Sequence, residues 1–127
     1  MKFSGVLVRP LADQADRDGR RIDPAGVTFL PGVRYPVTVE FDMDNAVGTA
    51  TVSRAEDGSL VAEGDLDGDG EAIMGAKPPQ LAVGIHVIED ERDRMGAELI
   101  RRSKLNAIAL TANHADPGQP PIEEVPE

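Results

Sequence analysis

Residues 46–66, AVGTATVSRAEDGSLVAEGDL, carry the clearest structural signal in the chain. Two runs in which apolar and polar side chains alternate flank the triplet Glu56-Asp57-Gly58, and such alternation is typical of strands that bury one face. An Asp-Gly pair supplies the positive φ that a tight hairpin turn requires. The stretch therefore predicts a β-hairpin, and it favours a mainly β protein.

The residues just before this hairpin belong to the stretch PVTVEFDMDNAVGTATV (36–52), which begins with another strand-like alternation. The pattern predicts an apolar face that carries Val37, Val39 and Phe41. It predicts an acidic face that carries Glu40 and Asp42. We interpret the acidic face as solvated surface that keeps an exposed strand soluble. Phe41 is the more informative residue, because it shares its predicted face with the apolar side chains.

Other parts of the chain repeat the strand pattern in short pieces. Further strands are predicted at 3–8, 27–30 and 80–90, and at 97–112 as one or two strands with RRSK between them. Residues 67–76 favour one short helix, with Asp69 or a neighbour as its N-cap and Pro78 and Pro79 ending it.

These elements add up to about seven short strands and one short helix, which predict a mainly β domain of barrel-like or sandwich form. The domain is expected to cover residues 1–115. Residues 116–127 are rich in proline and show no periodicity, so we expect an extended C-terminal tail.

The composition limits the classes of function. The chain has 127 residues, and 13 basic against 23 acidic residues give a net charge of -10. Residues 36–75 alone hold one basic and ten acidic residues, a charge of -9. This charge disfavours contact with nucleic-acid phosphates. There is no cysteine and no apolar run of membrane-spanning length, so we expect no thiol chemistry and no membrane contact, with cytoplasm as the default compartment.

One acidic motif resembles a metal site. Asp65, Asp67 and Asp69, followed by Gly70, match the first ligand positions of a calcium-binding loop. The twelfth position should be a bidentate glutamate and is Ala76, and the residues before the motif have the pattern of a strand where a helix is required. We therefore favour a solvated acidic loop, and we expect neither a metal nor a cofactor.

The sequence offers few residues that could catalyse hydrolysis. The serines of the chain lack the Gly-x-Ser-x-Gly context of a nucleophile elbow. His86 lies in a predicted strand and His114 near the tail, and a lone histidine in a strand is more often a surface residue than a catalyst. Because triads assemble in space, an endopeptidase that uses Ser103 with His86 or His114 remains an alternative.

Taken in order, several phrases resemble a known family. FSGVLV and DRDGRRIDPAGVTF are followed by PVTVEFDMDNAVGTATV, EDGSLVAEGDL, GEAIMGA, LAVGI and LNAIALTANHAD. Their order and spacing resemble the phage prohead proteases of the HK97 type, which are related in fold to the herpesvirus assemblins. The resemblance covers roughly residues 3–116. It implies a prohead protease-like, barrel-like fold.

The chain departs from this family where the family carries its chemistry. Positions that hold the catalytic histidine, the serine nucleophile and the acid of the triad in the family correspond here to Phe41, Ala82 and Ala107. None of these side chains can attack a carbonyl, take up a proton or orient an imidazole. A buried polar group without partners is destabilising, so coordinated replacement by apolar residues is consistent with a scaffold kept for its shape. The resemblance thus implies an inactive member, with Phe41 filling the former site.

The implied function is structural. We expect a capsid-associated protein of a tailed phage, most simply a decoration protein that binds and stabilises the major capsid protein, made in the bacterial host cytoplasm and located in the virion. A homo-oligomer, such as a trimer on the capsid, is expected. The tail is the expected docking arm, through Pro117, Pro120, Pro121, Ile122 and Val125. The alternatives are an internal scaffold or assembly chaperone of the prohead, and an active prohead serine endopeptidase with a relocated site.

Overall fold

The hairpin predicted over residues 46–66 is present. Strand β5 (Asp42–Arg54) pairs antiparallel with β6 (Leu60–Leu66). Gly58 has the positive φ, 91°, that the Asp-Gly turn requires. The Asp57 carboxylate accepts hydrogen bonds from the hydroxyl and the N–H of Ser59, at 2.6 and 2.9 Å, and these bonds hold the pKa of Asp57 below its ordinary value. The turn chemistry predicted from the sequence is therefore confirmed.

The computed structural model describes residues 1–11, 19–75, 77–92, 94, 96–112 and 119–126. Besides β5 and β6, its elements are β1 (Lys2–Val8), β2 (Arg20–Ile22), the 3-10 helix η1 (Pro24–Gly26), β3 (Val27–Thr28), β4 (Tyr35–Val39), α1 (Gly68–Ile73), β7 (Gln80–Arg92), β8 (Glu98–Thr111) and β9 (Glu123–Glu124). In these ranges, the prediction of a mainly β fold with one short helix is confirmed.

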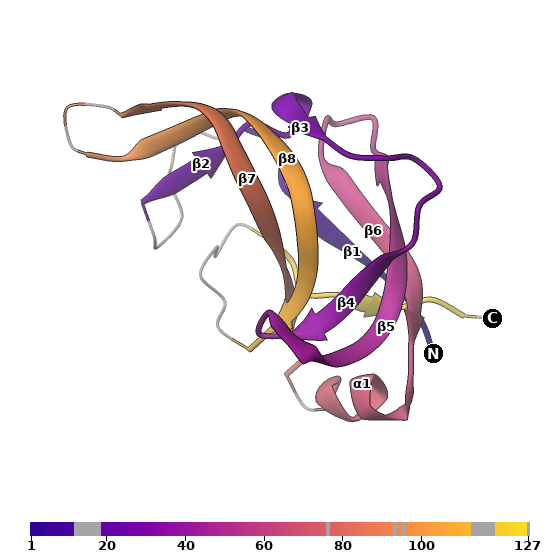
Figure 1. Ribbon diagram of the computed structural model, residues 1–127. Helices are drawn as coiled ribbons and strands as arrows, with labels where there is room; N and C mark the ends of the chain where they lie inside the picture. The colour runs from indigo at the N-terminus through magenta and orange to yellow at the C-terminus, as the bar shows by residue number, and fades with distance from the viewer. Residues whose placement is uncertain (12–18, 76, 93, 95, 113–118, 127) are drawn as a thin grey trace.

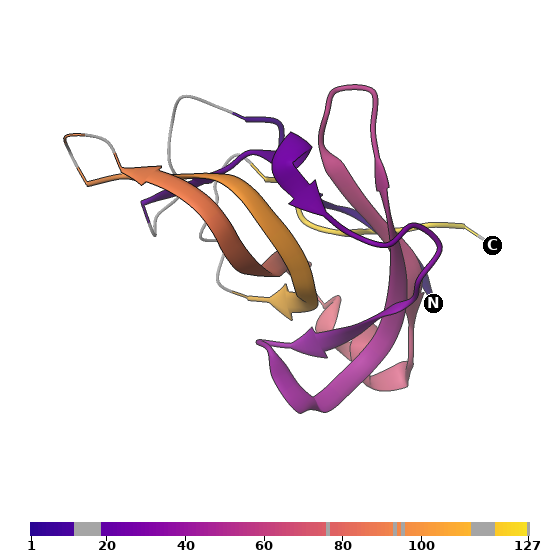
Figure 2. The same cartoon turned by 45° about the horizontal axis from the view of Figure 1, so that its top comes forward.

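The strands belong to one curled sheet (Figures 1 and 2). Strand β8 organises it: β7 pairs antiparallel with one edge of β8, and β2, β3 and β4 pair in parallel with successive parts of the other edge. From β4 the sheet continues through β5, β6 and β1 to β9. The far parts of β7 and β8 extend from the body as an arm (Figure 1).

The sheet does not close into a barrel by strand pairing in the part of the chain that is described. The side chain of Gln119 joins two of its strands instead, because Nε2 donates to the carbonyl of Val6 on β1 at 2.6 Å and to that of Leu81 on β7 at 2.7 Å. Ile122, which is 2% exposed, lies beside Gly5 and Leu81. The predicted barrel is thus not observed. An amide and a buried aliphatic side chain fill the seam between β1 and β7.

The C-terminal segment 119–126 is extended and binds to its own domain. The backbone N–H of Ile122 donates to Pro79 at 3.0 Å, and that of Val125 donates to Lys2 at 2.9 Å. Between these bonds, β9 pairs antiparallel with β1. The residues that link this segment to β8 lie outside the described part of the chain.

The break predicted at RRSK is wrong, because β8 runs without interruption from Glu98 to Thr111. Arg102 and Lys104 are exposed, whereas Ser103 and Leu105 between and after them are buried. Arg101, which precedes them, is also exposed, so two consecutive charged side chains extend into solvent from one continuous strand. A run of charged residues is therefore compatible with an exposed strand as well as with a turn.

The core lies inside the curl of the sheet and is mostly aliphatic. Phe3 is its fully buried aromatic side chain, at 1% exposure. Aliphatic side chains from five strands belong to the same buried cluster: Leu7, Val37, Val47, Leu60, Leu66, Ile108 and Leu110. This packed interior fixes β4, β7 and β8 relative to one another, and these strands carry the residues of interest.

Candidate functional site

Phe41 lies in a tight turn and not on a strand. β4 ends at Val39 and β5 begins at Asp42, with which Val39 pairs, so Glu40 and Phe41 form a two-residue connection. Their φ values are 51° and 61°. Positive φ at both central residues is typical of a type I′ hairpin turn, a geometry that favours Asn and Gly. The predicted phase of Phe41 with Val39 is therefore wrong, because the chain reverses direction before Phe41.

Contacts of Glu40 hold this unusual turn in place. The backbone N–H of Glu40 donates to the carbonyl of Leu110 at 3.0 Å. Its carboxylate accepts hydrogen bonds from the N–H of Ala112 at 2.8 Å and from the hydroxyl of Thr111 at 3.2 Å. The sequence pattern alone indicates that Glu40 is solvated surface. It is exposed, but its carboxylate also fixes the end of β8 to the turn.

The ring of Phe41 lies against the sheet at Gly84. Gly84 of β7 pairs with Ala107 of β8. A Cβ atom built on Gly84 would lie 3.1 Å from Cε1 of Phe41 and 3.1 Å from Cβ of Ala107. Only a glycine fits between these two neighbours without displacing one of them. Phe41 is 41% exposed, so its ring covers this part of the sheet incompletely.

Ala82 lies two residues before Gly84 and pairs with Ala109 of β8. Alternate residues of a strand point to the same face, so Ala82 and Gly84 share the face that the ring of Phe41 contacts. The structure thus brings Phe41 and Ala107 together at Gly84, with Ala82 next along the strand. One phenyl ring and two methyl groups offer no nucleophile, base or acid at this place.

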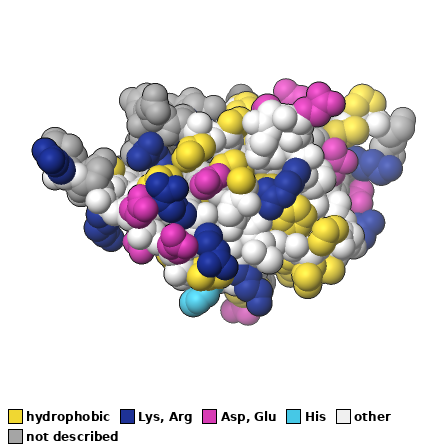
Figure 3. All heavy atoms as spheres, turned by 90° about the horizontal axis from the view of Figure 1, so that it is seen from above, with side chains coloured by type: hydrophobic (Ala, Val, Ile, Leu, Met, Phe, Trp, Pro, Cys, Tyr) yellow, Lys and Arg dark blue, Asp and Glu magenta, His cyan; other side chains and the backbone are white. Residues whose placement is uncertain are grey.

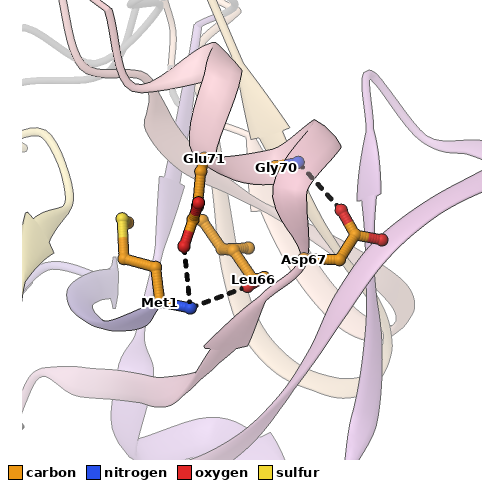
Figure 4. A network of polar contacts seen from close by, with 5 residues as sticks. All are labelled: Met1, Leu66, Asp67, Gly70 and Glu71. Atoms are coloured by element: carbon orange, nitrogen blue, oxygen red, sulfur yellow. Dashed lines mark hydrogen bonds and ion pairs between the residues drawn. The ribbon is translucent and has the colours of Figure 1, made fainter.

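The three aspartates of the calcium-like motif lie in separate environments. Asp65 lies 3.7 Å from a guanidinium nitrogen of Arg34. Asp67 is the N-cap of α1, and its carboxylate accepts a hydrogen bond from the N–H of Gly70 at 2.9 Å (Figure 4). Asp69 is exposed in the first turn of the helix. The described residues contain no group of three or more His, Cys, Asp or Glu side chains placed to hold a metal ion.

Figure 4 also shows how the start of the chain meets this helix. The amino group of Met1 donates to the carbonyl of Leu66 at 2.9 Å and lies 3.1 Å from the carboxylate of Glu71. An N-cap of Asp69 or a neighbour was predicted, and Asp67 fills that position. The acidic motif therefore begins a helix and contacts the first residue of the sequence.

Ser103 and His86 do not form a catalytic pair. Ser103 is 1% exposed, and its hydroxyl has no hydrogen-bond partner among the described residues. His86 is exposed and pairs across the strands with Lys104, while Ser103 pairs with Val87. Neighbouring residues of a strand point to opposite faces, so the imidazole lies on the other side of the sheet from the hydroxyl. His114 lies outside the described residues.

The predicted docking residues of the tail divide into two groups. Ile122 is part of the core, so its assignment as a partner contact is corrected: the seam between β1 and β7 takes up its side chain. Pro120, Pro121 and Val125 are exposed. Pro117 lies outside the described residues.

Sequence reasoning missed Gly84 and Glu40. Gly84 lies inside a predicted strand, and a glycine at such a position often marks the close approach of another group. The sequence alone does not identify that group. Glu40 gave no signal, because its partners Thr111 and Ala112 are about 70 positions away along the chain.

Comparison with known proteins gives no family. No family model, no curated protein and no solved structure matches this chain. In the described part of the chain, no helix has the length and apolar character needed to cross a membrane.

Proposed function

We propose that this chain is a non-catalytic, capsid-associated protein of a tailed phage, derived from a prohead protease-like scaffold. Its favoured role is that of a decoration protein that binds the major capsid protein and stabilises the shell. It would reach the virion from the cytoplasm of a bacterial host.

The observation that supports this proposal most strongly is that Phe41, Ala82 and Ala107 lie in one part of the structure. The resemblance to the prohead proteases, which rests on sequence order alone, assigns Phe41, Ala82 and Ala107 to the positions of the family's triad. A wrong alignment would give no reason for these residues, drawn from a turn and two strands, to lie together. Phe41 and Ala107 instead meet at Gly84, and Ala82 is on the same strand face as Gly84. A shared location supports the alignment, and the apolar side chains support loss of the activity.

The strained turn at Glu40 and Phe41 supports the idea that the chain has kept the shape of a protease-like scaffold. Positive φ at two residues other than glycine costs on the order of 1 kcal/mol or more for each residue, and such strain persists where the surrounding structure imposes it. A former catalytic histidine at position 41 would need a fixed turn to present its ring. Contacts of Glu40 with the end of β8 keep that turn although the chemistry is gone.

The composition of purified particles tests the role. Mature virions and proheads of the phage that encodes the chain would be analysed by quantitative mass spectrometry. A decoration protein is present in mature virions in a fixed ratio to the major capsid protein. A chain found in proheads and absent from mature virions would make it an internal scaffold or assembly chaperone, and the decoration role would be rejected.

Incubation with capsid and scaffold proteins tests the absence of catalysis. We expect no cleavage, because Ser103 is buried away from His86. Cleavage that disappears in a Ser103→Ala variant would establish an active endopeptidase with a relocated site and would overturn the proposal.

A further inference from the structure

A groove lies on the opposite side of β8 from β7. It has a volume of about 530 Å³ and is formed by the segment that contains η1 and β3, together with one residue each from β5 and β8. Its lining residues are Ala25, Gly26, Val27, Thr28, Phe29, Pro31, Arg54 and Arg102. Two of them are arginines and none is acidic. In a chain with a net charge of -10, this is a local reversal of charge.

Arg54 is held in a fixed position in this groove. Its guanidinium donates to the carbonyl of Pro24 at 2.6 Å and to that of Val27 at 2.8 Å. It also lies over the ring of Phe29, 5.3 Å from the centroid. A guanidinium has five N–H donors, and these two bonds leave others for a ligand. The charge is therefore already oriented before anything binds.

Arg102 adds a second cation from β8. Its side chain is 64% exposed, and its ion pair with Glu89 is long, at 4.0 Å. An exposed ion pair of this kind contributes at most about 1 kcal/mol, so a carboxylate in the groove could replace Glu89. Figure 3, seen from above, shows Lys and Arg side chains together with Asp and Glu side chains on the face that carries β3 and β8, so the positive charge of the groove is local. The groove thus favours an acidic ligand with an apolar part that can contact Phe29 and Pro31.

The chain itself presents a segment of this chemistry. Glu123, Glu124 and Val125 are exposed, and Val125 is 37% exposed despite its apolar side chain. The end of the chain projects from the body beyond β5 and β6 (Figures 1 and 2). It combines two carboxylates with adjacent valine and proline in an extended conformation. Pairing of β9 with β1 already fixes the backbone of Glu123 and Glu124, so little conformational freedom is lost when their exposed side chains bind.

We propose that the groove around Arg54 and Arg102 binds the acidic C-terminal segment, Glu123 to Val125, of a second copy of this chain. The contact is head-to-tail: the groove of one copy receives the segment of the next, which can close into a ring. Carboxylates of the segment would pair with the two guanidinium groups. Val125 would pack against Phe29 and Pro31. Such self-association does not depend on a capsid partner.

Two variants with complementary defects provide the sharpest test. Arg102→Glu damages the groove and leaves the segment intact, whereas the double variant Glu123→Lys/Glu124→Lys damages the segment and leaves the groove intact. Sedimentation velocity at low salt should show association of the unaltered chain and monomers for each variant alone. An equimolar mixture should form heterodimers, because one intact groove then meets one intact segment. Monomers in the mixture, with association in the unaltered chain, would overturn the head-to-tail contact.

A binding measurement separates this contact from others. A labelled peptide of residues 119–126 should bind the unaltered chain in fluorescence anisotropy, and Arg102→Glu should weaken it by about tenfold or more, since a charge-assisted bond is lost. Lys77→Glu changes the charge equally at an exposed site outside the groove and should leave binding unchanged. Arg54→Lys, which keeps the charge and loses the fork geometry, should bind more weakly than the unaltered chain.

The remaining outcomes are equally decisive. A chain that stays monomeric at high concentration and does not bind the peptide would overturn the proposal. Binding of an unrelated Glu-rich peptide in an Arg102-dependent manner, without self-association, would assign the groove to acidic segments of another protein and would reject the second copy as its occupant.

Discussion

The ring of Phe41 covers Gly84, with Cε1 only 3.1 Å from the position that a Cβ atom on this glycine would occupy. Phe41 comes from a turn and Gly84 from a strand about 40 positions later, so their contact is a property of the tertiary structure. Because Ala107 closes on the same glycine from β8, the three positions form one packed unit.

This packing predicts a coupled response to substitution. Gly84→Val should lower the free energy of unfolding by about 1–3 kcal/mol, because two methyl groups must displace the ring or strand β8. In a chain that already carries Phe41→Ala, the same substitution should be less harmful, with a coupling energy of at least about 0.5 kcal/mol. Urea denaturation of the four chains measures this cycle. Gly75→Val, at a glycine with no neighbour within 4 Å, is the control. Additive effects would show that the ring does not contact the glycine.

The turn at Glu40 gives a second prediction. Glu40→Ala should lower the free energy of unfolding by about 1 kcal/mol, because the N–H of Ala112 and the hydroxyl of Thr111 lose a charged acceptor. Glu63→Ala, which removes an exposed carboxylate from β6, should change stability by less than about 0.5 kcal/mol. Thermal and urea denaturation can compare the two. Equal effects would mean that Glu40 acts as ordinary surface.

The hairpin at 46–66 and the start of α1 could be predicted because their determinants are local. Asp57, Gly58 and Ser59 form the turn among themselves, and Asp67 caps the helix through Gly70 three residues later. Periodicity of two located the main strands for the same reason. Where neighbours in the sequence decide the conformation, the sequence predicts it.

The turn at 40–41 and the seam of the sheet could not be predicted in this way. Glu-Phe carries neither of the residues that favour a type I′ turn, and contacts with the distant end of β8 impose its geometry. Gln119 bonds to Val6 across 113 positions, so no local pattern announces the bond. Apolar and polar residues alternate in the strands of open sheets and of closed barrels alike. The alternation therefore could not show that this sheet is open.

The seam gives a third prediction. Gln119→Ala should lower the free energy of unfolding by about 1–3 kcal/mol, because the carbonyls of Val6 and Leu81 lose a shared donor. Ile122→Ala should lower it by about 2–5 kcal/mol through the cavity that it leaves. Pro121→Ala, at an exposed position of the same segment, is the matched control. Stability that is unchanged in all three variants would show that the segment does not bind its own domain.

A carboxyl pair on the arm gives a fourth prediction. A hydrogen bond with Asp90 raises the pKa of Glu98, and burial adds to this effect. The folded state then binds the proton more tightly than the unfolded state. The stabilisation is complete below the ordinary glutamate pKa and is lost as pH rises through the raised value. In the Glu98→Gln variant, this decrease in the free energy of unfolding with rising pH should be absent. Urea denaturation of both chains from about pH 4 to about pH 7 measures the difference, and parallel curves would contradict it.

The proposed role, that of a structural protein of a phage capsid, is tested most directly by cosedimentation. The purified protein would be mixed with capsids that lack it, prepared from the phage proposed to encode it. We predict saturable binding in a fixed ratio to the major capsid protein, with no cleavage of that protein. Failure to bind at any stage of capsid maturation would contradict the account.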